Sequence, residues 1–331
     1  MGEIRKLIMI CDICPNYCNL SDGRKTICHQ DPIYDNENKI YTSKTTVEHI
    51  EESTLYHFMP GSKAFCVGLV GCNMQCSYCS YYTVAQPENE LLIPTKGYTP
   101  DEIVEMAIHN DADVIIWKFT EPTIHPKWII NTSRIAKRYD LKTAIVSNGF
   151  TSPETLEKIA PYVDGVCIDL KSMQDSFYDE VCGGYIEAIL NSIKYYLKHD
   201  IHIEIRNMII PGYNDSPENF KELINYIKST EKKIPLHFMR FNPAYKLKEL
   251  EKTSEKKIMY ATDLAAYMGL NYVYPDIEVA PKHKNNTYCK NCKHLLIKRS
   301  SDYTIESHVT DQCACENCNH IADVVQKTND Y

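Results

Sequence analysis

The feature that most constrains this chain of 331 residues is the stretch "GCNMQCSYC" at 71–79, where Cys72, Cys76 and Cys79 follow a C-x3-C-x2-C spacing. Thiolates are soft ligands that suit zinc and iron–sulfur clusters. Three of them cannot complete a four-coordinate structural zinc site or bind all four irons of a cubane cluster. A four-iron cluster held by three cysteines keeps one iron free for a molecule that carries an amine and a carboxylate.

The three cysteines lie in a region where predicted strands and helices alternate. Six runs rich in Val and Ile are predicted as strands: 63–70, 112–119, 141–148, 163–170, 201–210 and 234–241. Their nearly continuous apolar character is typical of strands buried on both faces. Helices are predicted to begin at Thr99, Ser152 and Ser216, each followed by Pro and then by an acidic residue.

Six successive β-then-α units favour a parallel sheet with right-handed crossovers. About 180 residues for six units is short of the about 250 that a complete eight-unit barrel needs. We therefore predict an α/β fold of the partial (β/α)6 barrel type. Such folds bind ligands at the carboxyl ends of their strands. The polar motifs that follow the predicted strands after the cysteine motif are "TEPT", "SNG", "DLK", "PGYND" and "FNPAY".

Two further sets of cysteines flank the predicted barrel. The N-terminal cysteine set is Cys11, Cys14, Cys18 and Cys28, and the C-terminal cysteine set is Cys289, Cys292, Cys315 and Cys318. Four thiolates can close a tetrahedral structural zinc site, and an auxiliary iron–sulfur cluster is the alternative for both sets. Cys313 is an alternative to Cys315. We predict a cysteine-rich module at 1–58, the barrel at 59–278 and a zinc-ribbon or rubredoxin-like module at 279–331.

Charge and hydropathy narrow the possible functions. The chain has 36 Lys and Arg against 44 Asp and Glu, a net charge of −8, which argues against a broad nucleic-acid-binding face. No apolar run reaches the length of about 18–20 residues that a membrane span needs. We find no signal-peptide pattern and expect a cytoplasmic protein. In a reducing cytosol, short cysteine clusters favour metal binding over disulfides.

The cysteine motif after a first strand resembles the signature of the radical S-adenosylmethionine (SAM) superfamily. Further segments resemble, in order, radical SAM enzymes of the AmmeMemoRadiSam type, which are related to pyruvate formate-lyase activating enzymes. These segments are "TEPTIHP", "SNGF", "IDLKSM", "MIIPGYND", "PLHFMRFNPAY" and "TYCKNC". The resemblance implies a [4Fe-4S] cluster on Cys72, Cys76 and Cys79, with SAM on the fourth iron. One-electron cleavage of SAM would give methionine and a 5′-deoxyadenosyl radical that abstracts hydrogen.

The resemblance also implies roles for residues at the ends of the strands. Glu121 would receive the amino group of SAM, because a buried ammonium needs an acceptor. Ser147 and Asn148 would contact the ribose hydroxyls or the SAM carboxylate. Asp169 and Lys171 would form a charge pair or contact the methionyl end.

Other candidates lie beside these positions. Further cofactor contacts are expected from Tyr78, from Thr120, which Pro122 turns toward the barrel, and from Met208 near the adenine. His237 and Arg240 are expected on the substrate side. The alternative for His237, within an apolar strand, is a buried histidine whose hydrogen bonds are satisfied.

The function expected from this resemblance is that of a radical SAM enzyme working under anaerobic conditions. Its substrate would be a protein or peptide, as for an activating enzyme, and flavodoxin or ferredoxin would donate the electron. The first alternative is the same chemistry on a small molecule, a nucleoside or RNA. The second is a cysteine-rich metal-binding interaction protein without catalytic activity.

Overall fold

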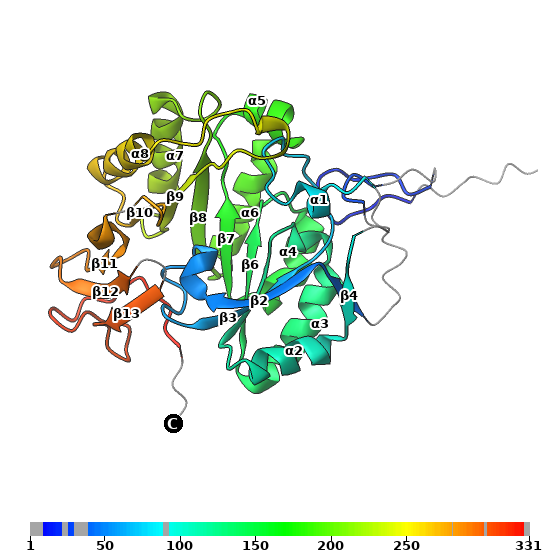
Figure 1. Cartoon of the computed structure of the whole chain (residues 1–331). Coiled ribbons are helices and arrows are strands. Elements are labelled where there is room, and N and C mark those ends of the chain that lie inside the picture. Colours follow the sequence, from blue (N-terminus) through cyan, green and yellow to red (C-terminus); the bar gives the residue numbers. More distant parts are fainter. Residues whose placement is uncertain are drawn as a thin grey trace, which may run out of the picture.

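The structure is a computed structural model that describes residues 9–21, 26–29, 39–88, 93–279, 281–300 and 303–327. Its centre is an eight-stranded sheet in the order β10-β9-β8-β7-β6-β5-β3-β2, with helices along its outer side (Figure 1). The strands are β2 Lys44–His49, β3 Lys63–Gly68, β5 Val114–Lys118, β6 Lys142–Ser147, β7 Gly165–Asp169, β8 His202–Ile209, β9 Leu236–Arg240 and β10 Val273–Pro275.

The predicted parallel sheet is confirmed. All six predicted strands are present and lie side by side in the order of the chain, and every pair from β3 to β10 is parallel. Two edge strands were not predicted. β2 pairs antiparallel with β3, and its sequence "KTTVEH" has too few apolar residues to stand out as a buried strand. β10 is only three residues long.

The helices are α1 Tyr82–Ala85, α2 Pro100–His109, α3 Pro126–Ala136, α4 Pro153–Ile159, α5 Asp175–Phe177, α6 Ile186–Lys198, α7 Pro217–Thr230 and α8 Glu255–Tyr267. The three predicted helix starts are confirmed. The side chains of Thr99, Ser152 and Ser216 each accept a hydrogen bond of 3.2 Å from the backbone N–H three residues later. These caps satisfy N–H groups that the first turn of a helix leaves without a partner.

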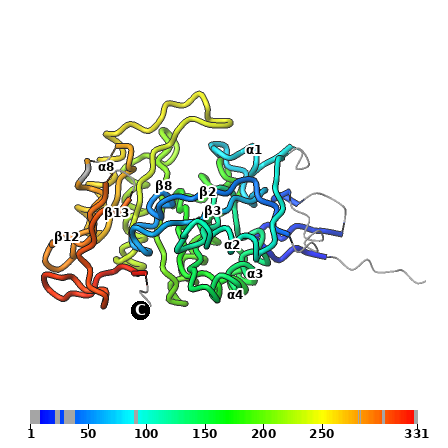
Figure 2. The backbone as a smooth tube through the Cα atoms, turned by 60° about the horizontal axis from the view of Figure 1, so that its bottom comes forward, coloured from blue at the N-terminus to red at the C-terminus, as the bar shows by residue number. Residues whose placement is uncertain are grey.

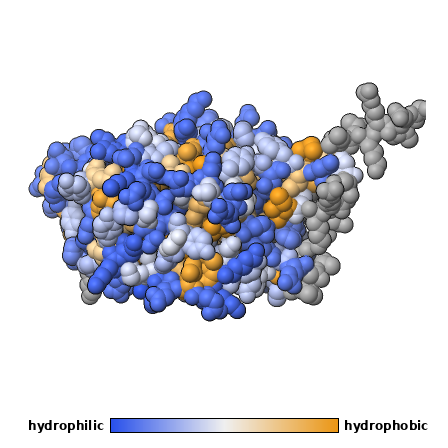
Figure 3. Space-filling model, turned by 90° about the horizontal axis from the view of Figure 1, so that it is seen from above, coloured by the Kyte–Doolittle hydropathy of each residue, from blue (hydrophilic) through white to orange (hydrophobic). Residues whose placement is uncertain are grey.

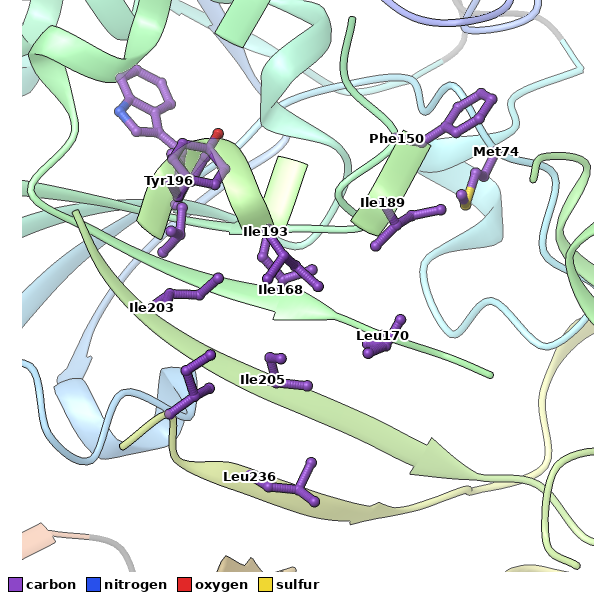
Figure 4. Close-up of a cluster of buried hydrophobic side chains, with 14 of the residues drawn as sticks. Met74, Phe150, Ile168, Leu170, Ile189, Ile193, Tyr196, Ile203, Ile205 and Leu236 are labelled. Atoms are coloured by element: carbon purple, nitrogen blue, oxygen red, sulfur yellow. The ribbon is translucent and has the colours of Figure 1, made fainter. Parts of the chain in front are cut away.

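Apolar side chains cover both faces of the sheet. On the outer face, α6 packs against β8, and its apolar side chains share one core with those of β7, β8 and β9 (Figure 4). The residues of this part of the core are Ile189, Ile193, Tyr196, Ile168, Ile203, Ile205 and Leu236. The inner face holds a second core, in which the chain from Ile50 to Met59 packs against Ala64, Cys66 and Ile116. This segment fills the inside of the partial barrel near the amino ends of its strands.

Two smaller sheets complete the described structure. β1 (Ile40–Thr42) pairs with β4 (Lys96–Tyr98), and the C-terminal region forms β11 (Thr287–Tyr288), β12 (Leu295–Ser300) and β13 (Tyr303–Ser307). The C-terminal sheet and the N-terminal residues lie on opposite sides of the barrel (Figures 1 and 2). Because β2 falls within 1–58 yet belongs to the main sheet, that segment shares strands with the barrel; the proposed domain limits remain predictions. No helix among the described residues is long and apolar enough to cross a membrane.

A buried carboxylate joins the barrel to the segment inside it. Glu204 on β8 has no exposed surface and accepts five hydrogen bonds of 2.7–3.2 Å, from the backbone N–H groups of Tyr56, His57 and Phe58 and from the rings of His202 and His237. Although burial raises the pKa of Glu204, its hydrogen bonds with the two histidines hold it well below its usual range. The carboxylate therefore contributes stability above the unfolded-state pKa, and this contribution is lost as the pH falls.

Glu204→Gln is expected to lower the free energy of unfolding at pH 7 by about 3 kcal/mol, because an amide N–H2 would face donors in place of one acceptor oxygen. Urea unfolding followed by circular dichroism measures this loss. Glu105→Gln, at an exposed position of α2, is the control and should change stability by less than about 0.5 kcal/mol. Equal effects of the two substitutions would contradict the assignment.

Candidate metal and cofactor site

The cysteine loop, Gly71–Cys79, follows β3 at the carboxyl end of the sheet. Gly71 has φ = 89°, a conformation that other residues rarely adopt, and this lets the chain turn directly before Cys72. The backbone N–H groups of Gln75 and Ser77 donate to the carbonyls of Cys182 (2.7 Å) and Val181 (2.9 Å). The loop is therefore fixed to the π-helical turn 178–182 by backbone hydrogen bonds.

The cysteine sulfurs lie among hydrogen-bond donors. Cys72 Sγ accepts from the Met74 N–H at 3.5 Å and from Asn148 Nδ2 at 3.6 Å. A hydrogen bond from the buried Cys182 thiol, opposed by burial and assisted by Lys171, lowers the pKa of Cys76 to about 7. Thiolates, and not thiols, bind iron, so the lowered pKa favours the form of Cys76 that an iron ligand would need.

Glu121 is buried beside Cys72 and receives four hydrogen bonds. They come from Thr123 N (3.0 Å), Thr123 Oγ1 (2.7 Å), Ser147 Oγ (2.8 Å) and Asn148 N (2.7 Å). Burial raises its pKa, and these bonds oppose the rise. Among the residues that the structure describes, no Lys or Arg forms an ion pair with Glu121. A ligand ammonium beside it would supply the missing positive charge, which is the role expected for the SAM amino group.

Asn73 connects Cys72 to the end of β6, and the sequence alone did not identify it as a site residue. Its amide has no exposed surface; Nδ2 donates to the Phe150 carbonyl at 2.6 Å, and Oδ1 accepts from Asn148 Nδ2 at 2.9 Å. Ser147 and Asn148, predicted from "SNG", therefore lie in one hydrogen-bonded group with Cys72 and Glu121. In the sequence, the only indication that Asn73 belongs to the site was its position between Cys72 and Cys76.

A second group forms around Asp169. Its carboxylate accepts from Arg206 Nε and from Lys171 Nζ at 3.3 Å. Although burial raises the pKa of Asp169, Arg206 and Lys171 lower it to about 2, so the group is ionised at neutral pH. The Lys171 ammonium lies 5.7 Å from the centre of the Tyr78 ring, and the Tyr78 hydroxyl lies 3.9 Å from Cys182 Sγ. The predicted Asp169–Lys171 pair is thus present, with Arg206 as an unpredicted third member.

Four other predicted site residues form no hydrogen bond with the Glu121 group or the Asp169 group among the described residues. His237 is buried and donates to Glu204 at 2.7 Å, the environment of the core histidine given above as the alternative. Arg240 Nε donates to the Thr253 carbonyl at 2.8 Å. The hydroxyl of Thr120 is buried and has no hydrogen-bond partner within the described part of the chain. Met208 is half-buried near the end of β8.

Aromatic side chains extend from the cysteine loop toward neighbouring strand ends, and sequence analysis did not assign them. Tyr81 packs edge-to-face on Phe119 at 5.4 Å, and Tyr82 stacks on Tyr245 at 4.5 Å. Phe119 (φ = 77°) and Tyr245 (φ = 49°) both have left-handed backbones, and backbone strain of this kind clusters at functional sites.

Seen from above, the molecule has a mostly hydrophilic surface with separate hydrophobic patches (Figure 3).

The C-terminal cysteine set has the geometry of a site for a single ion. Its four Sγ atoms lie within 4.8 Å of one another, with separations of 3.7 Å for Cys289–Cys318 and for Cys292–Cys315. A zinc–sulfur bond of about 2.3 Å places the corners of a tetrahedron about 3.8 Å apart. Cys315, and not Cys313, belongs to this group; Cys313 Sγ instead lies 3.7 Å from Gln326 Oε1.

The sequence of this chain is similar to those of several known proteins. Residues 67–227 match the family model described as the radical SAM superfamily. An uncharacterized protein of Methanocaldococcus jannaschii is 34% identical over 299 residues, which cover 87% of each chain. The pyruvate formate-lyase-activating enzyme of Clostridium pasteurianum is 24% identical over 68% of this chain and 88% of its own.

A solved structure from Bacteroides vulgatus, a domain of a pyruvate-formate lyase-activating enzyme, superposes with a TM-score of 0.41. It is 21% identical and covers 48% of this chain and 95% of its own.

Proposed function

Because this chain belongs to the radical SAM superfamily of enzymes, we propose that it is an activating-type enzyme that acts on a protein or peptide. Its cofactors are a [4Fe-4S] cluster and SAM, which together supply a 5′-deoxyadenosyl radical for hydrogen abstraction. The observation that carries the SAM assignment is the buried Glu121 carboxylate beside Cys72, which has protein donors on its oxygens and no described cationic partner.

The chain's own residues would divide the work as follows. Cys72, Cys76 and Cys79 would hold the cluster, and Cys182 and Lys171 would keep Cys76 ionised. Glu121 would orient the ammonium group of SAM. The burial of both groups excludes water, which protects reactive intermediates from side reactions.

Asp169, Lys171 and Arg206 would place charged groups beside the cofactor. Asp169 stays ionised between Lys171 and Arg206, so it can orient either cation without taking up a proton at neutral pH. Tyr78, Thr120, Ser147, Asn148 and Met208 remain proposed cofactor contacts, and Arg240 remains a proposed substrate-side residue. For His237, which is buried against Glu204, we propose the alternative of a core histidine whose hydrogen bonds are satisfied.

A protein substrate is supported by two observations. The aligned C. pasteurianum relative is named as an activating enzyme for another enzyme, pyruvate formate-lyase. Exposed Tyr81 and Tyr82 lie directly beyond the third cysteine, and aromatic side chains of this kind are enriched at protein interfaces. The AmmeMemoRadiSam type, a cytoplasmic location, anaerobic working conditions and a flavodoxin or ferredoxin donor belong to this proposal.

A relative from Methanocaldococcus jannaschii, 28% identical over 179 residues, is named a putative glycyl-radical enzyme activating enzyme, so glycine is the proposed site of hydrogen abstraction. The proposed substrate class is therefore tested with proteins from cells grown on α-deuterated glycine. The expected result is deuterium in 5′-deoxyadenosine when the enzyme is incubated anaerobically with SAM and this protein fraction. The small-molecule filtrate of the same cells is the control. If the filtrate or an RNA fraction stimulates 5′-deoxyadenosine formation and the protein fraction transfers no deuterium, the alternative substrates are correct.

We further propose that the C-terminal cysteine set holds a structural zinc ion. The purified chain is expected to contain about one zinc at this site, because four thiolates in a tetrahedral arrangement satisfy the ion completely. Cys292→Ser/Cys315→Ser should lose this zinc and lower Tm, while Cys313→Ser should retain it. Elemental analysis and thermal unfolding measure both effects, and zinc loss from Cys313→Ser would contradict the assignment of Cys315.

A further inference from the structure

The N-terminal cysteine set lies against the cysteine loop, whereas the C-terminal cysteine set lies on the other side of the barrel (Figures 1 and 2). Asn16, between Cys14 and Cys18, donates through Nδ2 to the carbonyl of Asn73 at 2.9 Å. The Ile27 carbonyl, next to Cys28, accepts from Gln75 Nε2 at 3.2 Å. Asn73 and Gln75 are the direct neighbours of Cys72 and Cys76 in the chain.

These contacts give two short connections between the cysteine groups. From Cys28 the path runs one residue to Ile27, across one hydrogen bond to Gln75, and one residue to Cys76. The second path runs from Cys14 or Cys18 through Asn16 and Asn73 to Cys72. The N-terminal cysteine set is thus one hydrogen bond away from the direct chain neighbours of Cys72 and Cys76.

The same module is anchored at the start of α4. Ser152, the N-cap of this helix, donates through Oγ to the Ile13 carbonyl at 3.0 Å, and Lys158 forms an ion pair with Asp12 at 2.9 Å. The position of Cys14 next to the barrel is thus fixed by bonds on two sides.

The thiols of Cys11, Cys18 and Cys28 lie near enough to Cys14 to act on it electrostatically, but the set is spread more widely than the C-terminal one. All four belong to the described residues, yet they do not form a group within 4.8 Å, as the C-terminal set does. A cubane cluster, in which each sulfur binds a different iron, holds its ligands farther apart than a single ion does.

We propose that Cys11, Cys14, Cys18 and Cys28 hold a second [4Fe-4S] cluster that passes electrons to the cluster on the cysteine loop. Each turnover needs one electron. An external one-electron donor protein would reduce the N-terminal cluster, which returns to its oxidised state when it reduces the cluster at Cys72, Cys76 and Cys79. That electron then cleaves the sulfonium carbon–sulfur bond of SAM. The electron-transfer role of the N-terminal cluster rests on the proposed radical SAM function, whereas the presence of the cluster does not.

The metal content is tested with Cys72→Ala/Cys76→Ala/Cys79→Ala, reconstituted without oxygen with iron and sulfide. About four irons per chain should remain, and dithionite should produce a [4Fe-4S] EPR signal that SAM does not alter. Wild type should carry about eight irons by the same analysis. A variant that holds only zinc, or a wild type with about four irons, overturns the second cluster. This count needs no catalysis, so it stands or fails separately from the proposed function.

The role is tested with Cys14→Ser/Cys18→Ser, and with Cys313→Ser as a control cysteine outside all three groups. Reduction of the remaining cluster by reduced ferredoxin should slow by about tenfold or more in the double variant. Dithionite, a small reductant that can reach the cysteine loop directly, should reduce it as fast as in wild type. A structural module would give equal effects with both reductants, and that result would overturn the relay.

Discussion

Cys76→Ala is expected to abolish SAM cleavage, lowering the rate of 5′-deoxyadenosine formation by at least about a thousandfold. Two remaining thiolates leave two irons of the cluster without protein ligands. The effect should accompany loss of the iron bound at the cysteine loop, because Cys76 is a buried cysteine of the motif whose pKa is lowered by a hydrogen bond from Cys182 and by Lys171. Mass spectrometry of the nucleoside and EPR of the reduced protein measure both losses.

Cys66→Ala is the matched control for this substitution. Cys66 is a buried thiol on β3, six residues before Cys72, and it packs in the inner core of the barrel. Its replacement should leave the iron content and the activity close to those of wild type. If Cys76→Ala kept its cluster and its activity, the C-x3-C-x2-C motif would not be the cofactor site.

Glu121→Gln is expected to weaken SAM binding by about 10- to 100-fold, because a charge-assisted hydrogen bond contributes about 1.5–3 kcal/mol. The amide also places an N–H2 group among the donors of Thr123, Ser147 and Asn148. Equilibrium dialysis with labelled SAM measures the affinity without catalysis.

Two comparisons separate binding from folding in this variant. Glu154→Gln, an exposed position in the first turn of α4, is the control and should retain wild-type affinity. S-adenosylhomocysteine carries the same amino group, so its binding should weaken to the same extent. Unchanged affinity for both ligands in Glu121→Gln would contradict the assignment of Glu121.

The sequence predicted the parts of this molecule that depend on local patterns. Continuous apolar runs identified the six central strands, and Ser-Pro or Thr-Pro starts identified α2, α4 and α7. β2 was missed because an edge strand with one exposed face has no such run. Sequence spacing also could not choose between Cys313 and Cys315, which lie two residues apart; only the fold brings Cys315 to the other three thiols.

The unpredicted site residues depend on contacts between distant segments. Arg206 reaches Asp169 from the neighbouring strand, and Asn73 bonds to Phe150, 77 positions later in the chain. Glu204 in "IHIEIRN" carried a usable signal, because a single carboxylate inside an apolar strand must find donors. Its partners at 56–58 could not be deduced, since nothing local connects that segment to β8.

The central claim is that this chain cleaves SAM reductively at the cysteine loop. The most direct measurement is anaerobic incubation of the reconstituted protein with SAM and dithionite, followed by quantification of 5′-deoxyadenosine and methionine. The account predicts equal amounts of both products from wild type and none from Cys72→Ala/Cys76→Ala/Cys79→Ala. Equal product formation by the two proteins, or none from a wild type with a reduced cluster and the deuterated protein fraction present, would contradict it.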